Sequence, residues 1–244
     1  MDATYLLVGL GAFLFATRKA NAATGQAAPQ AQQGQMLTLT PPNTKLPLDV
    51  RVAIIRSLFQ NQIPNFDYVP YAISVGQRES GGDYRPAHKG AAAKGYVFGM
   101  NQYGYSGMYQ MGAQALESAG YIKRGTWATP GTGAHFEILT SKNPSYWTEK
   151  CPNGIEQFMN TPAIQEAAML EMTLMNYRGL KRAGVLTDSS PPDVKGGYIA
   201  AAHISGVGGA AKLHRGIVTA DGNGTPNDRY YQVGAATQVA SRVG

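Results

Sequence analysis

Apolar side chains recur every three to four residues over much of the chain after Leu48, which is the period of a helix with one buried face. Runs that alternate apolar and polar residues, as half-buried β-strands do, are nearly absent. The pattern therefore predicts a mostly α domain over residues 48–244. We expect its helices between 49 and 64 and at 70–79, 113–119, 155–159, 162–183 and 197–214.

Residue types that begin or end helices support several of these boundaries. Asp49 has a side chain suited to cap the first helix, and Pro64 would end it. Thr161 and Pro162 are favoured types at an N-cap and at the first helical position, so the helix after them has the clearest start. The stretch 81–107 is rich in Gly and Tyr and predicts no regular element.

The first 22 residues have a different character. Residues 5–16 form an uncharged apolar run that is followed by Arg18 and Lys19. The run is shorter than the roughly 20 residues that span a bilayer, and Ala-Asn-Ala at 20–22 resembles a signal-peptidase site. The positive charges follow the run instead of preceding it, which favours an uncleaved anchor over a cleaved signal. We expect residues 1–22 to be a hydrophobic membrane anchor or signal segment.

Residues 23–47 predict a flexible linker between this segment and the domain. Residues 23–35 are Gln, Ala, Gly, Pro and Thr, with no charge and no large apolar side chain to offset the entropy of ordering. Pro41, Pro42 and Pro47 then keep the chain extended.

Composition narrows the class of partner. The chain has 21 Lys and Arg against 15 Asp and Glu, a net charge of +6, which suits an anionic polymer or a lipid surface. The basic residues are scattered and no nucleic-acid-binding motif accompanies them, so we expect no nucleic acid partner. Cys151 is the only cysteine, so an intramolecular disulfide is impossible.

Glu79 is the first candidate for chemistry. It ends an apolar helix and is followed by Ser80, Gly81 and Gly82. Apolar packing and the negative end of the helix dipole both disfavour a carboxylate, so Glu79 is placed to hold a proton that it can donate. An Arg-Glu-Ser-Gly string is weak evidence by itself, because most glutamates at helix ends are solvated surface groups, so the assignment needs support from elsewhere in the chain.

Further motifs follow Glu79 in a fixed order. They are SGMYQMG at 106–112 with Ala115 and Leu116 in register, EQFMNTPAIQE at 156–166, AAHISGVGG at 201–209, DGNGT at 221–225, and Tyr230. With Glu-Ser-Gly at 79–81, this series resembles the lytic transglycosylases of the lysozyme-like superfamily, particularly the type found in phage tails and virions. The resemblance covers roughly 71–231 and implies a lysozyme-like domain.

The resemblance also implies a reaction and a site. Glu79 would be the catalytic acid and base that cleaves peptidoglycan glycan strands, without a metal or cofactor, and the turn with Gln110 would line the sugar cleft. It implies a membrane-associated enzyme of a virion or cell envelope that acts in the periplasm, with other virion proteins as further partners. The expected substrate contacts are Ser80, Tyr109, Gln110, His203 and Tyr230.

The chain departs from the family pattern in two places. His203 and Ile204 stand where many relatives have Tyr and Asn, and a histidine in such a position is more often a core or rim residue than a catalyst. Gln102 offers a second, weaker match to the Gln110 turn. Either Tyr230 or Tyr231 could reach the Glu79 carboxyl, or both could be core aromatics.

Other functions receive less support. Cys151 precedes Pro152 without a nucleophile signature, which disfavours a thiol peptidase, and the histidines lack the spacing of a zinc site. The main alternative is a membrane-tethered virion or secretion-apparatus protein that binds glycan without cutting it. A hydrolase would need a second carboxylate, for which Asp83, Glu117 and Asp221 are the candidates.

Overall fold

The computed structural model describes residues 44–86, 99–101, 103–127, 138–139 and 144–240. Over this part the chain is mostly α-helical, as the sequence predicts, and its β-pairing is limited to isolated bridges. The helices are α1 (Leu48–Leu58), α2 (Tyr68–Ser80), α4 (Ala113–Ser118), the 3-10 helix η3 (Pro144–Tyr146), α6 (Gly154–Asn160), α7 (Pro162–Arg182), α8 (Pro192–His214) and α9 (Asn227–Ala240).

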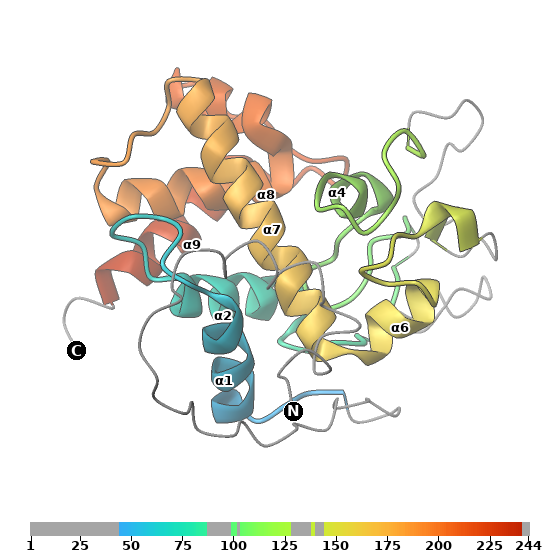
Figure 1. The fold of residues 1–244 in the computed structure, drawn as a ribbon. Coiled ribbons are helices and arrows are strands. Elements are labelled where there is room, and N and C mark those ends of the chain that lie inside the picture. The colour runs from blue at the N-terminus through green and yellow to red at the C-terminus, as the bar shows by residue number, and fades with distance from the viewer. Residues whose placement is uncertain (1–43, 87–98, 102, 128–137, 140–143, 241–244) are drawn as a thin grey trace, which may run out of the picture.

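The long helix α7 runs through the middle of the fold (Figure 1). It packs against α1, α4, α6 and α8, and its buried residues lie on every face of the helix because neighbours surround it. Helices α8 and α9 lie on one side of α7, and α4 and α6 on the other (Figure 1). Helix α9 also packs on α2, which brings the end of the chain to the helix that carries Glu79.

Two glycines let α8 and α9 pack closely. A Cβ on Gly196 would overlap the carbonyl oxygen of Gly234, and a Cβ on Gly234 would overlap that of Gly196. Further along α8, Gly206 has φ 66° and ψ 173°, which interrupts the helical backbone and kinks the helix. Glycine adopts this left-handed φ at little cost, so its place in the chain fixes the kink.

Several boundaries differ from the sequence predictions. The expected cap at Asp49 is wrong: α1 starts at Leu48 after Pro47, and Asp49 lies in the first turn, where its charge favours the positive helix end. Helix α1 also ends at Leu58, before Pro64. Thr161 is the N-cap of α7 with Pro162 following, as expected.

The ends of the domain also differ from expectation. Thr44 is buried and its hydroxyl donates to Asp83, so residues 44–47, which the sequence assigns to the linker, belong to the folded domain. Helix α8 starts five residues before the expected Gly197, and α9 has no counterpart among the predicted helices. The expected hydrophobic segment and residues 23–43 of the linker lie outside the described residues. No helix in the described ranges has the length and apolar character needed to cross a bilayer.

Candidate active site

Helix α2 places Glu79 in its last turn. Asp67 caps the start of the helix by accepting a hydrogen bond from the Val69 amide at 3.2 Å. Gly81 ends it in the left-handed conformation, with φ 67°, and donates its amide to the Gln77 carbonyl at 3.0 Å. A glycine is favoured in this position because other residues pay a steric penalty there. The sequence Glu-Ser-Gly thus sets both the chemistry and the end of the helix.

The Glu79 carboxyl is held through one of its two oxygens. The Tyr230 hydroxyl donates to Oε1 at 2.5 Å, and the His203 Nε2 lies 3.3 Å from the same atom. Oε2 has no hydrogen bond to any described residue, and the side chain is 15% exposed. Of the two tyrosines considered from the sequence, Tyr230 is therefore the one that reaches Glu79.

Tyr230 and His203 also support one another. Their rings lie 6.3 Å apart and nearly parallel, at 19°. Burial, followed by the charge of Glu79 and its hydrogen bond, raises the pKa of Tyr230, although the neighbouring Arg78 lowers it. Tyr230 is thus a neutral hydroxyl that donates to Glu79. The His203 Nδ1 is buried and has no hydrogen-bond partner within the described part of the chain.

Arg78 is a site residue that the sequence prediction missed. Its guanidinium lies over the Tyr230 ring, 4.4 Å from the ring centroid, which is the geometry of a cation–π contact. Arg78 precedes Glu79 in a visible motif, but its partner belongs to α9, an element that the apolar pattern does not predict.

Ser80 and the residues after it hold the end of α2. The Ser80 hydroxyl donates to the Gly76 carbonyl at 3.1 Å and accepts from the Asp83 amide at 3.1 Å. Asp83 in turn accepts from the Arg85 amide at 2.9 Å and from the Thr44 hydroxyl. These bonds give Ser80 a role in shaping the loop beside Glu79.

Gln110 lies in a tight turn that packs on α2. Its backbone has φ 46°, and its amide nitrogen Nε2 donates to the Gly107 carbonyl at 2.9 Å. Its Oε1 accepts from Asn101 at 3.0 Å, so the side chain is folded back on its own segment. The Met108 side chain sits against Gly76, one turn before Glu79, and joins the turn to the helix. Gln102, the alternative match, lies outside the described residues.

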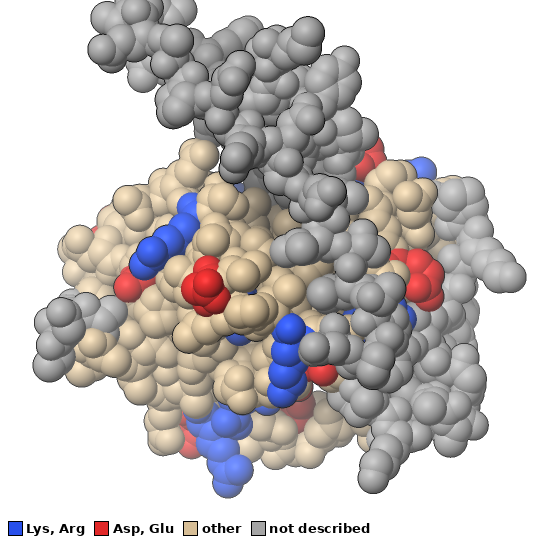
Figure 2. All heavy atoms as spheres, turned by 90° about the horizontal axis from the view of Figure 1, so that it is seen from below, with Lys and Arg blue, Asp and Glu red and all other residues tan. Residues whose placement is uncertain are grey.

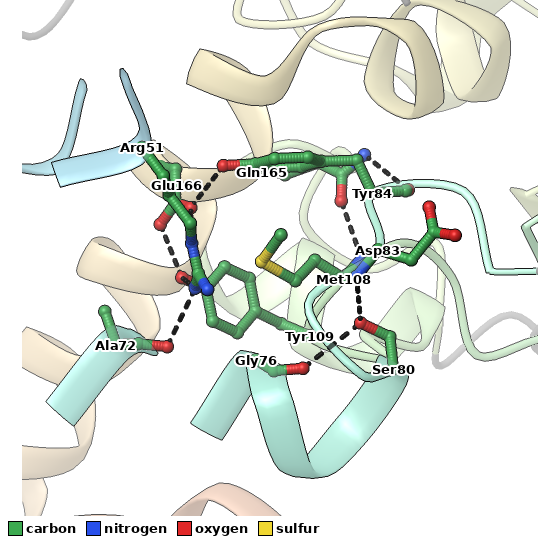
Figure 3. A network of polar contacts seen from close by, with 10 residues as sticks. All are labelled: Arg51, Ala72, Gly76, Ser80, Asp83, Tyr84, Met108, Tyr109, Gln165 and Glu166. Carbon is green, nitrogen blue, oxygen red and sulfur yellow. Dashed lines mark hydrogen bonds and ion pairs between the residues drawn. The ribbon is translucent and has the colours of Figure 1, made fainter. Parts of the chain in front are cut away.

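Tyr109 does not face the site, contrary to the expected contact with substrate. Its side chain is 1% exposed, and its hydroxyl donates to Glu166 and accepts from Arg51 at 2.9 Å. Figure 3 shows it inside a buried polar network beside Met108. Tyr109 is therefore a core residue of this domain.

A cavity of about 620 Å³ lies next to His203, the side chain that contacts Glu79, although Glu79 itself is not among the residues that line it. It lies among α4, α7, the kinked part of α8 and the segment at Thr219 and Ala220, and His203 lines it while contacting Glu79. The lining mixes methionines and small residues with groups that can bind a polyhydroxylated ligand. The polar ones include Gln114, Ser118, Asn176, Ser205 and Lys212.

The other candidate carboxylates hold backbone instead of facing Glu79. Glu117 accepts from the amides of Gly125 at 2.9 Å and Trp127 at 2.6 Å. Asp221 Oδ1 accepts from the amides of Asn223 at 2.9 Å and Thr225 at 2.7 Å, inside its own loop. Neither acid contacts Glu79, His203 or Tyr230 through any hydrogen bond between described residues.

Two further chemistries gain no support. Cys151 is fully buried, and burial raises the pKa of its thiol to about 12, so it stays protonated and inert. No group of three or more potential metal ligands occurs in the described segments. On the face in Figure 2, basic and acidic side chains of the described residues are interspersed.

Comparison with protein-family models, curated proteins and solved structures finds no match to the chain. The geometry of the site is therefore the basis for assigning a function.

Proposed function

We propose that this protein is a lysozyme-like lytic transglycosylase that cleaves the MurNAc–GlcNAc bond of peptidoglycan. The observation that carries the proposal is the asymmetry of Glu79: two side chains engage Oε1, while Oε2 has no partner among the described residues. The position of Glu79 at the end of an apolar helix supports the same role, as does its contact with His203, which lines a cavity with polar groups.

The proposed reaction begins with a proton on Oε2. Glu79 donates this proton to the glycosidic oxygen, the bond to C1 of MurNAc breaks, and positive charge develops at C1. The resulting carboxylate is stabilised by the Tyr230 hydroxyl, since a hydrogen bond to a charged acceptor is stronger than one to a neutral group. A neutral His203 with its proton on Nε2 would donate to the same oxygen.

Glu79 would then act as the base. It removes the proton from the C6 hydroxyl of the same MurNAc, and O6 forms a bond to C1, which regenerates the protonated acid. The product is a 1,6-anhydro-MurNAc end. A hydrolase would instead use a second carboxylate as nucleophile or to activate water. Asp83, Glu117 and Asp221, the candidates from the sequence, bind loop groups, which favours the transglycosylase route.

The proposed setting is a membrane-associated enzyme of a virion or cell envelope that opens the wall locally from the periplasm. This part of the proposal rests on the apolar run and linker at 1–43 and on the resemblance to virion enzymes. Phage entry would require such local cutting, with other virion proteins as partners.

The decisive experiment compares the full-length protein with a Glu79→Gln variant on purified cell walls. Gln keeps the shape of the side chain and removes the proton, so we expect clearing to fall by a factor of about 10³ or more. Glu149→Gln makes the same chemical change at an exposed position and should clear walls like the parent. Equal clearing by Glu79→Gln and the parent would refute the assignment.

Mass spectrometry of the digest identifies the product. Anhydro ends are lighter by one water than reducing ends, and we expect only anhydro ends. Reducing ends alone would make the enzyme a lysozyme with Glu79 still as the acid. A parent that binds glycan strands without cutting them would instead support the glycan-binding structural alternative.

A further inference from the structure

A charged side chain of α7 is completely buried away from Glu79. Glu166 is 0% exposed, and its Oε1 accepts from Arg51 Nε at 2.9 Å and from the Tyr84 hydroxyl at 2.6 Å. Its Oε2 accepts from the Tyr109 hydroxyl. Burial alone lowers the pKa of Arg51, but Tyr109, Glu166 and Tyr84 together raise it, so the guanidinium stays charged. These contacts join α1, the loop after α2 and the Gln110 turn to one residue (Figure 3).

Gln165, the residue before Glu166, bonds to the backbone of the loop after α2, of the Gln110 turn and of α6. Gln165 accepts from the Met108 amide at 2.7 Å and donates to the carbonyls of Tyr84 and Phe158, each at 3.1 Å. Gly107 lies so close that a Cβ on it would overlap the Gln165 side chain, and it has φ 70°. The turn that carries Gln110 is thus seated directly on α7.

The network reaches α2 at Ala72 and at Gly76, about two turns and one turn before the catalytic candidate. Arg51 Nη2 donates to the Ala72 carbonyl at 3.0 Å. A Cβ on Gly76 would lie 2.7 Å from Arg51 Nη2 and 2.8 Å from Met108 Sδ, so both side chains lie against the helix backbone at this residue. Because Gly76 is three residues before Glu79, these contacts with Arg51 and Met108 lie within one turn of Glu79.

We propose that Gln165 and Glu166 are positioning residues that fix the Glu79 helix relative to the Gln110 turn. This inference rests on the proposed function for its effect on catalysis. Stability alone does not require such a network, since buried ion pairs are often replaced by apolar residues without loss. Directional hydrogen bonds to four segments restrict orientation more tightly, and a displacement of about 1 Å at a catalytic group can cost about 100-fold in rate.

The first test replaces the charged network by an apolar one of similar volume, with Arg51→Met, Tyr84→Phe, Tyr109→Phe and Glu166→Leu together. We expect the melting temperature to be retained and kcat on soluble glycan strands to fall 10- to 100-fold, with KM changed by less than threefold. A folded variant with the kcat of the parent would overturn the proposal, because the network would then serve stability only.

A second pair of variants keeps the test decisive if the fourfold replacement unfolds. Gln165→Met removes the bonds to the Gln110 turn. Gln238→Met is the matched control, since this buried glutamine bonds to the backbone of Asp67 at the far end of α2. We expect about a tenfold larger loss of kcat for Gln165→Met at equal loss of stability. Equal effects on kcat would contradict the proposal.

A readout independent of activity separates this inference from the proposed function. Spin labels on cysteines introduced at the exposed residues Gln77 of α2 and Gln114, just after the turn, report the distance between the two segments. The parent should give one narrow distance distribution, and Gln165→Met a broader or shifted one. An unchanged distribution would refute positioning whether or not the protein cuts glycan, while a parent that does not cut refutes only the enzymatic assignment.

Discussion

Glu79 accepts a hydrogen bond from one tyrosine and Glu166 from two, and each lies beside a nitrogen-containing side chain, yet their surroundings differ. Both oxygens of Glu166 are occupied, its neighbour Arg51 carries a permanent charge, and the side chain is inaccessible. Among the described residues Glu79 has contacts on one oxygen only, and its neighbour is the imidazole of His203. If the proposed function holds, the two carboxyls separate a structural role from a chemical one inside one small domain.

The candidate acid is distinguished mainly by a carboxyl oxygen that has no hydrogen-bond partner among the described residues. A tyrosine partner does not distinguish it, since both carboxyls have one. A carboxylate whose acceptor positions are all occupied gains stability from its protein partners and has no group left for a substrate. A carboxyl with one open oxygen gives up part of that stabilisation and keeps an atom available for proton transfer. Substitution of Glu166 should therefore lower stability, whereas substitution of Glu79 should lower activity more than stability.

The largest expected effect is on stability at Glu166. Glu166→Gln leaves the Arg51 charge buried without its counter-ion, which should lower the free energy of unfolding by about 3 to 5 kcal/mol. Urea denaturation measures this change, with the exposed Glu149→Gln as a control that should stay within about 0.5 kcal/mol of the parent. If Glu166→Gln kept the midpoint of the parent, the ion pair would not be structural.

Alkaline pH should lower the free energy of unfolding, because the tyrosines that contact the two carboxyls ionise more readily in the unfolded chain. Burial is the first cause that raises the pKa values of Tyr84, Tyr109 and Tyr230. Each tyrosine thus contributes stability that is complete below its unfolded pKa of about 10 and is lost as pH rises toward the folded value. The loss is about 1.4 kcal/mol per tyrosine per pH unit in that range.

Urea titrations at pH 8, 10 and 11 would measure this dependence. Stability should be level up to about pH 9 and fall steeply above pH 10. A Tyr84→Phe variant should show a shallower fall, because one ionising group is removed from the unfolded chain. A parent whose stability does not change between pH 8 and 11 would contradict the burial of these hydroxyls.

The smallest expected effect concerns the Tyr230 hydroxyl, which donates a hydrogen bond to Glu79. Tyr230→Phe removes the donor to Oε1, which should lower kcat about tenfold and leave stability within about 1.5 kcal/mol. Tyr231→Phe is the neighbouring control, whose ring packs on Gly197 and Tyr198 and not on Glu79. Equal kcat values for the two variants would show that the hydroxyl does not assist Glu79.

Much of the helical frame follows from local sequence. Thr161 and Pro162 mark the start of α7, and the apolar spacing before Glu79 places it at the end of α2 within one residue. Helix α9 is not predicted from the apolar pattern because the residues on its buried face are mostly polar or small. Its buried residues are Asn227, Tyr230, Gly234, Thr237 and Gln238, so no apolar period is present.

The sequence predicts some contacts of the candidate site and not others. Motif order selects Glu79 and offers Tyr230 as one of two choices, because both lie in recognisable blocks. The network on Glu166 cannot be read from a local pattern, since its partner Arg51 is 115 positions away and both look like ordinary helix-surface charges. The prediction that Tyr109 contacts substrate fails for a related reason. Its motif marks a turn, and only the packing of the whole domain decides which side of that turn faces inward.

Glu79 and Tyr230 are 151 positions apart, which has a consequence for biosynthesis. A ribosome that adds about 5 to 20 residues per second completes α2 roughly 8 to 30 seconds before α9 emerges. During that interval the carboxyl lacks its hydroxyl donor, and the surface of α2 that α9 covers is bare. The order of synthesis therefore delays this contact until α9 has been made, so shorter nascent chains would lack the hydroxyl that Tyr230 donates to Glu79.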